Sequence, residues 1–498
     1  MSVLDLDLHE LAGRVRRGEL SAEEVAEQSL ERIREASALN AFLHVSEDAV
    51  RVRARELDAR RARGETLGAL AGVPIAVKDS LCTADAPTTC ASKILTRDGT
   101  KESGYRPPYD ATVVDRLRRA DALLVGKTNQ DEFAMGSSSE KWRIRPGVEP
   151  WDITRTPGGS SGGSAVSVAS GLALAALGSD TGGSIRQPAA FTGTVGIKPS
   201  YGRVSRYGLV AFASSLDQVG PFARDVRSAA RVLEVIAGHD PRDSTSRETP
   251  VGDYVAACDR EPKGLRIGVP EDYFGPGLDA EIAVAVRAAL DRLTADGCRV
   301  VPLSMPTTAH GVATYYVLAT AEASSNLARF DGVRYGMRVE RAGADLASLY
   351  RASRGAGFGA EVKRRILLGT YVLSAGYYDA YYRKAQAVRE LVRADFARAF
   401  EEVDVIVTPT SPTPAFLLGE RLDDPLAMYL ADVYTLPASL AGLAALSLPV
   451  GLTEAKAGQA TLPIGLQVMA PAFAEDTLVR AAAAIERSSP FAGRRPPA

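Results

Sequence analysis

A segment rich in glycine and serine, between Pro157 and Pro188, constrains this chain more than any other feature. It carries the tripeptide Gly-Gly-Ser three times, at 158–160, 162–164 and 182–184. Glycine allows a positive φ and lets backbone N–H groups approach a ligand without an obstructing Cβ. Successive N–H groups can form an oxyanion hole, beside which a serine hydroxyl is a candidate acyl-transfer nucleophile. A flexible linker is the alternative, but residues 165–177 are apolar and compatible with a helix, which disfavours it.

A nucleophilic serine needs a base, and the chain offers few histidines for that role. None of the four lies in a polar motif with a nearby acid; they are His9, His44, His239 and His310. A Ser-His-Asp triad stays open, because triad members need not be close in sequence. A lysine kept neutral by burial is the other common base.

Lys78 is the lysine that best fits this requirement. It ends the apolar run Val73–Val77, which follows Gly72 and is typical of a buried strand. Burial at the end of such a strand favours the neutral amine. The alternative is a side chain that extends along the surface and keeps its charge in water.

Together these residues resemble the amidase signature family, whose members use a Ser–cis-Ser–Lys triad. The resemblance makes Ser184 the nucleophile, Ser160 the bridging serine and Lys78 the base. The 24 positions between the two serines match the family. The residues alone do not rank Ser184 above Ser160 or Ser164. The resemblance also assigns an oxyanion hole to the backbone N–H groups of Thr181, Gly182, Gly183 and Ser184.

Segments outside the glycine-rich stretch are most similar, within the family, to the glutaminase subunits of tRNA-dependent amidotransferases. They span 88–93, 108–114, 126–137, 201–209, 323–336 and 361–366. The resemblance implies that glutamine is hydrolysed through a glutamyl ester and that ammonia passes to a partner that amidates Glu-tRNA(Gln), Asp-tRNA(Asn) or both. The implied partners are a kinase and tRNA-binding subunit, which uses ATP and Mg²⁺, and a small bridging subunit. No cofactor and no metal is implied for this chain.

The resemblance also nominates residues that bind free glutamine. Arg364 is the candidate for the α-carboxylate, since a guanidinium offers two parallel donors. Asp432 is the candidate for the α-ammonium group, and Tyr315 for a wall and hydrogen-bond partner. Arg364 lies in a basic run, 363–365, so a solvated helix charge is its alternative. A helix cap is the alternative for Asp432.

Three stretches depart from the family pattern. Lys78 and Ser160 are 82 positions apart, more than expected, and the polar, glycine-punctuated residues 95–106 fit a surface insertion that accounts for the excess. Residues 141–150 replace a stretch that is smaller and less charged in relatives, and Gln130 stands where methionine is expected. The last two departures lie just upstream of the active serines, where they bear on substrate entry or subunit docking.

Three other motifs point to functions that their contexts disfavour. Residues 158–162 fit the Gly-x-Ser-x-Gly elbow of α/β-hydrolases, but 151–157 contains a proline and little apolar sequence for the strand that must precede it. Residues 126–128 resemble the end of a phosphate loop, but an aspartate takes the place of its first glycine. Six arginines lie within 51–63, and the interleaved acidic residues favour a solvated helix over an RNA-binding surface.

The composition is typical of a soluble intracellular enzyme. The 498 residues are 46% hydrophobic, which is enough for one very large domain or two fused ones. A net charge of −2 gives no strong attraction to tRNA, so a partner is expected to hold it. The four cysteines form neither a disulfide framework nor a zinc pattern, which suits a reducing compartment. The sequence shows no signal-peptide pattern, and no run approaches the ~20 apolar residues of a membrane span. A cytoplasmic location is therefore expected.

Hydrophobic patterning predicts an α/β fold, and the resemblance implies a single large amidase-signature domain with a mixed sheet flanked by many helices. Residues 1–68 are expected to form a helical region packed on the core, with a helix that starts after Ser21. Residues 69–490 are expected to form the amidase domain, with a mainly helical embedded region at about 309–402. A strand–helix–strand unit is expected over 265–302.

Rival interpretations stay open. A stand-alone amidase of the same fold, acting on small amides, shares the triad and differs in pocket and partners. A catalytically silent scaffold subunit has no need for Lys78, Ser160 and Ser184 together. An α/β-hydrolase esterase is more distant and requires an essential histidine.

Overall fold

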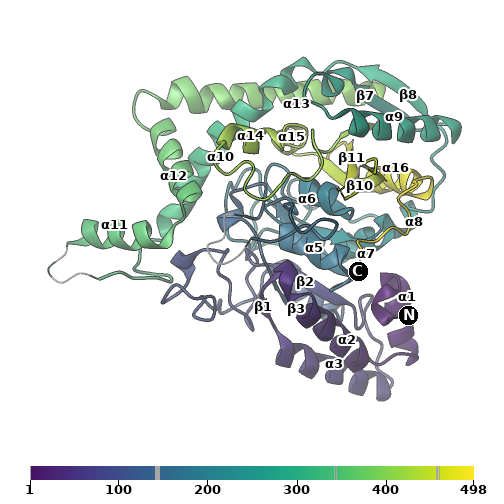
Figure 1. Cartoon of the computed structure of the whole chain (residues 1–498), viewed down its shortest axis with the longest axis horizontal. Helices are drawn as coiled ribbons and strands as arrows, with labels where there is room; N and C mark the ends of the chain where they lie inside the picture. Colours follow the sequence, from purple (N-terminus) through teal and green to yellow (C-terminus); the bar gives the residue numbers. More distant parts are fainter. Residues whose placement is uncertain are drawn as a thin grey trace.

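The computed structural model describes residues 2–140, 146–340, 343, 345–455, 458 and 460–497. Eleven strands form one mixed sheet, with helices around it (Figure 1). The strand order is β1-β3-β2-β4-β6-β5-β10-β11-β9-β7-β8. The predicted α/β fold with a large mixed sheet is confirmed. The strands are β1 (Phe42–Val45), β2 (Pro74–Lys78), β3 (Leu123–Thr128), β4 (Ala175–Asp180), β5 (Val195–Lys198), β6 (Gln218–Ala223), β7 (Arg266–Pro270), β8 (Arg299–Leu303), β9 (Val405–Pro409), β10 (Ala444–Leu452) and β11 (Pro463–Ala470).

The α-helices of the described residues surround this sheet. They are α1 (Leu8–Arg17), α2 (Ala22–Glu35), α3 (Glu47–Ala62), α4 (Thr112–Arg119), α5 (Gly162–Ala169), α6 (Arg186–Thr192), α7 (Val226–Ile236), α8 (Tyr254–Ala257), α9 (Ala280–Ala295), α10 (Gly311–Asn326), α11 (Leu346–Gly357), α12 (Ala360–Val372), α13 (Lys384–Glu402), α14 (Pro425–Leu430), α15 (Leu436–Ala441) and α16 (Glu475–Arg487). A short π-helix, η8 (Tyr378–Arg383), directly precedes α13.

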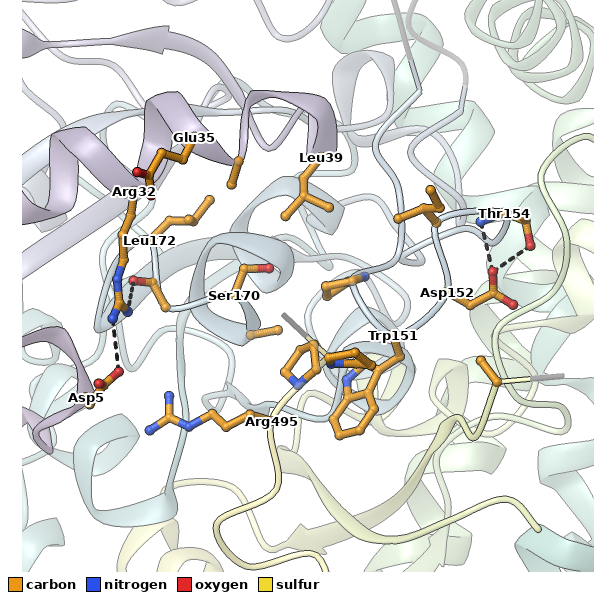
Figure 2. Close-up of a pocket in the computed structure, with 18 of the residues that line it drawn as sticks. Asp5, Arg32, Glu35, Leu39, Trp151, Asp152, Thr154, Ser170, Leu172 and Arg495 are labelled. Carbon is orange, nitrogen blue, oxygen red and sulfur yellow. Dashed lines mark hydrogen bonds and ion pairs between the residues drawn. The ribbon is translucent and has the colours of Figure 1, made fainter. Parts of the chain in front are cut away.

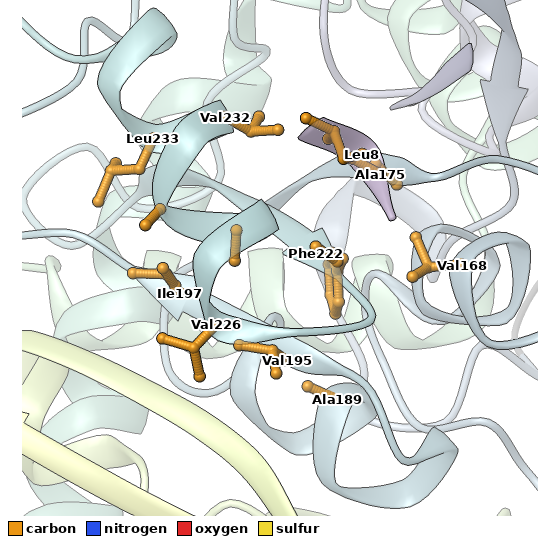
Figure 3. Close-up of a cluster of buried hydrophobic side chains, with 14 of the residues drawn as sticks. Leu8, Val168, Ala175, Ala189, Val195, Ile197, Phe222, Val226, Val232 and Leu233 are labelled. Atoms are coloured by element: carbon orange, nitrogen blue, oxygen red, sulfur yellow. The ribbon is translucent and has the colours of Figure 1, made fainter. Parts of the chain in front are cut away.

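The middle of the sheet is covered on both faces. Every residue of β4, β6, β9 and β11 is buried, whichever face its side chain points to. Helices α5 and α6 pack on β4 and β5, and α7 packs on β6. Figure 3 shows apolar side chains of these helices gathered around the sheet residues Phe222 and Val195. This packing fixes the strand ends from which the site is built.

The N-terminal region contains the expected helix, which begins after Ser21. The Ser21 side chain accepts a hydrogen bond of 2.9 Å from the N–H of Glu24, as an N-cap does. The expectation of helices alone over 1–68 does not include β1, which pairs antiparallel with β3 at the sheet edge. A strand of four residues is too short to show a clear period, so the sequence pattern did not reveal it.

Three arginines of α3 form ion pairs with residues of other elements. Arg53 and Arg60 form ion pairs of 2.7 and 2.6 Å with the buried carboxylate of Asp121. Arg51 pairs with Glu27 at 2.6 Å. These contacts tie α3 to α2 and to the turn before β3, so these three arginines lie between elements rather than on the solvated helix face that was expected.

The strand–helix–strand unit over 265–302 is confirmed as β7, α9 and β8, with β7 and β8 parallel. Between residues 311 and 402 the described chain runs through α10, α11, α12 and α13 without a strand and then enters β9. In Figure 1, α12 lies at one end of the long axis and α11 projects beyond it.

Two of the misleading motifs have structural explanations. Residues 126–128 lie within β3, where the ammonium group of buried Lys127 is 3.3 Å from Asp79, so they form no phosphate-binding turn. No strand of the described chain lies between β3 and β4, so Ser160 does not follow a strand as a hydrolase elbow requires.

Candidate active site

The ends of two parallel strands bring the predicted residues together. Strand β2 ends at Lys78, and β4 ends at Asp180, directly before the turn 181–184. These strands are parallel neighbours, with Val77 opposite Leu177. Because the carboxyl ends of parallel strands meet at one edge of a sheet, Lys78 and the turn lie at the same edge, where open α/β sheets commonly bind ligands.

Lys78 is fully buried and contacts two serines of the loop before α5. Its Nζ lies 2.7 Å from Ser160 Oγ, 2.8 Å from Ser161 Oγ and 3.4 Å from the carbonyl oxygen of Ser179. Burial lowers the pKa of Lys78 to about 7, against the opposing effect of the Asp131 carboxylate. A substantial fraction of the amine is therefore neutral at neutral pH and can accept a proton.

The hydrogen bonds around Lys78 indicate which serine donates to it. Ser161 Oγ lies 3.1 Å from the Ser179 carbonyl oxygen, which can only accept. The Ser161 hydroxyl proton is directed there, so Ser161 accepts from Lys78. Among the described residues Ser160 Oγ has no such carbonyl partner, so its hydroxyl is free to donate to Lys78 when the amine is neutral.

The backbone around Ser160 is closely packed. The Gly159–Ser160 peptide bond is cis. The N–H of Asp131 donates to the Ser160 carbonyl at 3.2 Å, and a Cβ on Gly159 would overlap the Asp131 carboxylate and lie 2.7 Å from the Ser138 nitrogen. Asp131 also accepts from the N–H groups of Ser138 and Ser139. One carboxylate thus holds the loop beside Ser160 and adds negative charge near Lys78.

Ser184 differs from Ser160 and Lys78 in being partly exposed. It is 7% exposed, whereas the other two residues are fully buried. Its carbonyl accepts from the N–H of Ser161 at 3.2 Å, which ties the turn to the loop that carries Ser160. Among the described residues no side chain or backbone group forms a hydrogen bond with its hydroxyl. Of the three residues, Ser184 is the one that a substrate can reach.

The N–H groups of this turn are available to a ligand. No hydrogen bond within the described chain uses the N–H of Gly182, Gly183 or Ser184 as donor. A Cβ on Gly182 would lie 2.8 Å from the ring of Tyr315, and one on Gly183 would lie 2.8 Å from Asp432 and overlap Thr435 Oγ1. Glycine is therefore required at both positions by the side chains that pack against the turn.

A buried ion pair, which the sequence analysis missed, holds the turn at both ends. The guanidinium of Arg186 donates twice to Asp180 at 2.9 Å, and both residues are fully buried. Arg186 also donates to the carbonyl of Thr435 at 2.7 Å, and the Thr435 hydroxyl donates to the Gly182 carbonyl at 2.7 Å. Asp180 and Arg186 flank the glycine-serine turn in sequence, and this spacing is the signal that could have identified them.

Asp432 and Tyr315, the two residues nominated to bind substrate together with Arg364, lie beside the glycines of the turn. One Asp432 oxygen accepts from the Ser137 hydroxyl, and the other has no hydrogen-bond partner among the described residues although it is buried. Burial raises the pKa of Asp432 to about 7. An ammonium group that contacted the unpartnered oxygen would satisfy it and lower this pKa.

Arg364 does not reach these residues. It projects from α12 with 44% of its side chain exposed and pairs with Glu361. The next residue, Arg365, points inward with 3% exposed, and its Nε donates to Glu361 at 2.8 Å. Its guanidinium lies 5.3 Å from the ring of Tyr316, which packs edge-on against Tyr315 at 5.1 Å.

Of the basic run 363–365, the third member is therefore the one that points toward Tyr316 and the buried side of α12. The inward residues of α12 include Val362, Arg365 and Gly369, which recur at helical spacing. This period places Arg365 on the buried face and Arg364 beside it on the exposed one. The register of the apolar residues was the signal that separates the two arginines.

A large surface cavity is separate from this site. It has a volume of about 1270 Å³ and lies between the end of α2, the end of α5 and the C-terminal tail (Figure 2). Ala169, the last residue of α5, and Ser170, which follows it, line this cavity at the opposite end of the helix from Ser160. At a rise of 1.5 Å per residue this is roughly 12 Å of helix. None of the predicted site residues lines it.

Of the three departures from the family pattern, two lie wholly within the described residues. Gln130 is fully buried, and neither atom of its side-chain amide has a hydrogen-bond partner among the described residues. Within 141–150, residues 141–145 lie outside the described residues; Glu149 is buried and accepts from the N–H groups of Trp151 and Asp152. Within the predicted insertion 95–106, Leu95 and Thr96 are buried, so the surface part is shorter than predicted. Residues 97–106 are mostly exposed and form a loop closed by a bridge between Thr96 and Gly104.

Other chemistries find no support in the described part of the chain. None of the four histidines contacts Lys78, Ser160 or Ser184; His9 interacts with the Arg227 carbonyl, and exposed His239 lies near Glu248. No group of His, Cys, Asp and Glu side chains there is arranged to hold a metal ion. No described helix combines the length and apolarity that crossing a membrane requires.

Comparison with known proteins decides the family. The model of the family named Amidase matches residues 24–479. The chain belongs to the amidase family. The resemblance read from the glycine-serine segment is confirmed, and an α/β-hydrolase esterase is ruled out.

Within the amidase family, the similarity to one class of subunit extends over the whole chain. The A subunit of glutamyl-tRNA(Gln) amidotransferase from Moorella thermoacetica is 54% identical over 497 residues, which cover 100% of this chain and 99% of that protein. The crystal structure of the subunit of that name from Thermotoga maritima has a TM-score of 0.80 and 39% identity, with 100% of this chain and 98% of that one covered.

The amidase fold by itself does not separate this class from stand-alone enzymes. A native peptide amidase from Stenotrophomonas maltophilia matches with a TM-score of 0.81 and 32% identity, covering 99% of this chain and 98% of that one. Its overall similarity in shape equals that of the Thermotoga subunit. Function has to be argued from the site and from the higher sequence identity to the amidotransferase subunits.

Proposed function

We propose that this chain is the glutamine-hydrolysing subunit of a tRNA-dependent amidotransferase and that it works in the cytoplasm. The observation that carries the chemistry is the fully buried Lys78, whose Nζ lies 2.7 Å from Ser160 Oγ, beside the turn that exposes Ser184 and its unpartnered N–H groups. The full-length similarity to amidotransferase subunits supports glutamine as the substrate.

In this mechanism Ser184 Oγ attacks the side-chain amide carbon of glutamine. The Ser184 proton passes to Ser160 Oγ as the Ser160 proton passes to neutral Lys78. The oxyanion is stabilised by N–H groups of 181–184, each worth about 2.7–4 kcal/mol. The relay then returns a proton to the leaving nitrogen, the C–N bond breaks and ammonia departs. Water resolves the glutamyl ester by the same relay and yields glutamate.

The two ends of glutamine would be held by opposite charges. Asp432 offers its unpartnered carboxylate oxygen to the α-ammonium group, and Tyr315 forms the wall beside Gly182. Arg365, rather than Arg364, supplies the buried guanidinium near these residues and is our candidate for the α-carboxylate. Two charged contacts at a fixed separation would favour free glutamine over simple amides.

The ammonia would be used by a partner. In this proposal two further subunits complete the enzyme: one binds misacylated tRNA and uses ATP and Mg²⁺, and a small one bridges. The acceptor is Glu-tRNA(Gln), Asp-tRNA(Asn) or both. The net charge of −2 is consistent with tRNA being held by a partner.

Three substrates test this proposal against a stand-alone amidase. Ammonia release is measured with glutamine, with 5-amino-5-oxopentanoate, which lacks the ammonium group, and with 4-aminobutanamide, which lacks the carboxylate, each with and without the partner subunits. We expect glutamine to have the highest kcat/KM and the Asp432→Asn variant to lose most of the preference over 5-amino-5-oxopentanoate. Equal or faster hydrolysis of simple amides by the wild type would identify a stand-alone amidase instead.

A further inference from the structure

The outer face of α12 and the π-helix η8 exposes a row of large apolar and aromatic side chains. Leu367 is 70% exposed, and half-exposed side chains adjoin it; they are Leu368, Tyr371, Tyr377, Tyr378 and Tyr381. We call these six residues the α12–η8 surface. Single exposed apolar residues are ordinary, but a contiguous group of this size marks an interaction site.

Three tyrosines of the α12–η8 surface pack against one another. The rings of Tyr371 and Tyr377 are 4.3 Å apart, and Tyr381 lies 6.0 Å from each of them. None of the residues of η8 is buried, so the π-helix presents its aromatic side chains to solvent. Rigid tyrosines with few rotatable bonds lose little conformational entropy on binding, and they are enriched at the centres of protein interfaces.

A hollow and a set of positive charges border this surface. The hollow has a volume of about 370 Å³ and is lined on one side by Leu373, Tyr378 and Tyr382, of which the two tyrosines stack at 5.2 Å. Its other side is mostly polar and includes Glu322 and Asn326. Residues 360–385 contain five basic and two acidic side chains. Arg365 and Glu361 form a buried pair, and Arg383 and Asp379 form an exposed one at 3.1 Å, which leaves Lys363, Arg364 and Lys384 as the excess positive charge. The exposed rim is therefore basic.

We infer that the α12–η8 surface is the docking site of a partner protein subunit, which contributes an apolar segment flanked by acidic side chains. This inference rests on the proposed function, because an amidotransferase subunit requires partners. The leucines at its centre can neither stack on a base nor pair with a phosphate, which favours a protein over RNA. The basic rim matches acidic flanks and provides the charge complementarity that directs association.

The position of the surface suits docking without distortion of the site. Helix α12 lies at one end of the molecule's long axis, with its inner face against α10 and its outer face unpartnered (Figure 1). Arg365 is on the inner face and Leu367 on the outer face of the same helix. A partner that covers the outer face would therefore not displace Arg365 from its buried position.

A matched pair of substitutions tests the inference. Leu367→Asp places a negative charge in the surface, and Val284→Asp places one on α9, which lies toward the other end of the long axis, where Val284 is 69% exposed. The binding of the purified full chain to its two amidotransferase partner subunits is measured. We expect Leu367→Asp to weaken binding by at least about ten-fold and Val284→Asp to leave it within two-fold. Equal binding by both variants, or no binding by the wild type, would overturn the inference.

Two further measurements separate the other occupants. If the free wild-type chain forms a dimer that Leu367→Asp dissociates while partner binding is unchanged, a second copy covers the surface and the inference is wrong. If Leu367→Asp weakens only the binding of transcribed tRNA to the free chain, RNA covers it, and the inference is again wrong. The glutamyl adduct formed by both variants with glutamine reports the proposed function independently, because neither residue belongs to the catalytic machinery.

A cysteine probe tests the site of contact directly. The four native cysteines are buried, so a maleimide benzophenone reagent should label only an introduced cysteine. Labelled Leu367→Cys should cross-link to a partner subunit on irradiation of the assembled complex, and labelled Val284→Cys should not. A cross-link from Val284→Cys alone would place the partner elsewhere and contradict the inference.

Discussion

Lys78 and Lys198 are both buried lysines whose pKa is lowered by burial to about 7, yet their surroundings differ. Lys78 contacts the hydroxyls of Ser160 and Ser161, whereas Lys198 donates to the carbonyls of Pro199 and Leu443. A low pKa alone therefore does not make a base. The position of Lys78 next to a hydroxyl that can relay a proton is what distinguishes it.

The two lysines give a matched test of the base. Lys78→Met removes the proton acceptor and should lower the rate of ammonia release from glutamine by about a hundred-fold or more. Lys198→Met removes a lysine of similar burial and should leave the rate within a few-fold, with a loss of stability of about 1–3 kcal/mol because two buried carbonyls lose a donor. Circular dichroism melting separates the effects. Equal loss of activity in both folded variants would remove Lys78 from the proposed role.

The charge on Lys78 predicts how activity depends on pH. The neutral amine is the active form, so the rate should rise with pH through about 7. Asp131 is the group that most opposes the lowered pKa of Lys78. Asp131→Asn should therefore shift the rising limb to lower pH. The measurement is kcat/KM for 5-amino-5-oxopentanoate, which has no ammonium group to engage Asp432. A shift to higher pH would show that Asp131 does not act through the charge of Lys78.

At the scale of the element, α12 carries two adjacent arginines on different faces. Arg365→Lys keeps the charge but loses the planar pair of donors, and it should raise KM for glutamine at least about ten-fold with a smaller change in kcat. Arg364→Lys should change KM less than two-fold, because that side chain is half-exposed and pairs with Glu361 on its own helix. The opposite ranking, from initial rates at varied glutamine concentration, would return the carboxylate-binding role to Arg364.

The turn after β4 makes a second prediction at this scale. Gly183→Ala inserts a Cβ that overlaps Thr435 Oγ1, so the turn must move and its N–H groups lose their alignment. We expect kcat to fall by about 10²–10³, the effect of losing one oxyanion donor. Gly355→Ala is the control: a Cβ there meets nothing within 4 Å, and alanine should stabilise α11 by roughly 0.5–1 kcal/mol. Unchanged kcat in Gly183→Ala would argue against this turn as the oxyanion hole.

At the scale of the whole molecule, a buried carboxyl group of the C-terminal helix α16 binds the start of α7, which is distant in sequence. Glu486 accepts from the N–H of Val226 at 2.9 Å, and burial raises the pKa of Glu486 to about 8. Between about pH 4.5 and 8, the Glu486 carboxyl group is therefore protonated in the native state and ionised in the unfolded state. The contribution of Glu486 to the free energy of unfolding falls as the pH rises through this range.

Replacement of Glu486 should change this pH dependence. In urea unfolding, the free energy of unfolding of Glu486→Gln minus that of the wild type should be more positive at pH 9 than at pH 5. The wild type carries the cost of a buried charge only at the higher pH. A difference that is equal at the two pH values would mean that Glu486 is ionised, or neutral, in both states throughout.

The candidate catalytic residues, which the structure brings together, could be found in the sequence where their signal is local. A lysine that ends an apolar run, and serines in glycine turns, have their character set by neighbours in the chain. The choice between Arg364 and Arg365 depends on the register of α12, which two adjacent residues do not show. The short strand β1 pairs with β3, which is distant in sequence, and four residues alone do not show a strand period. The Asp180–Arg186 pair was missed although its spacing around the turn is a local signal.

The most direct test of the account is intact-protein mass spectrometry after rapid quenching with glutamine. Wild type, Ser184→Ala and Ser160→Ala are compared, each alone and with the partner subunits. The account predicts a glutamyl adduct on the wild type, none on Ser184→Ala, and slower formation on Ser160→Ala, whose relay is broken while its nucleophile remains. An adduct that persists on Ser184→Ala and disappears on Ser160→Ala would make Ser160 the nucleophile and contradict the central assignment.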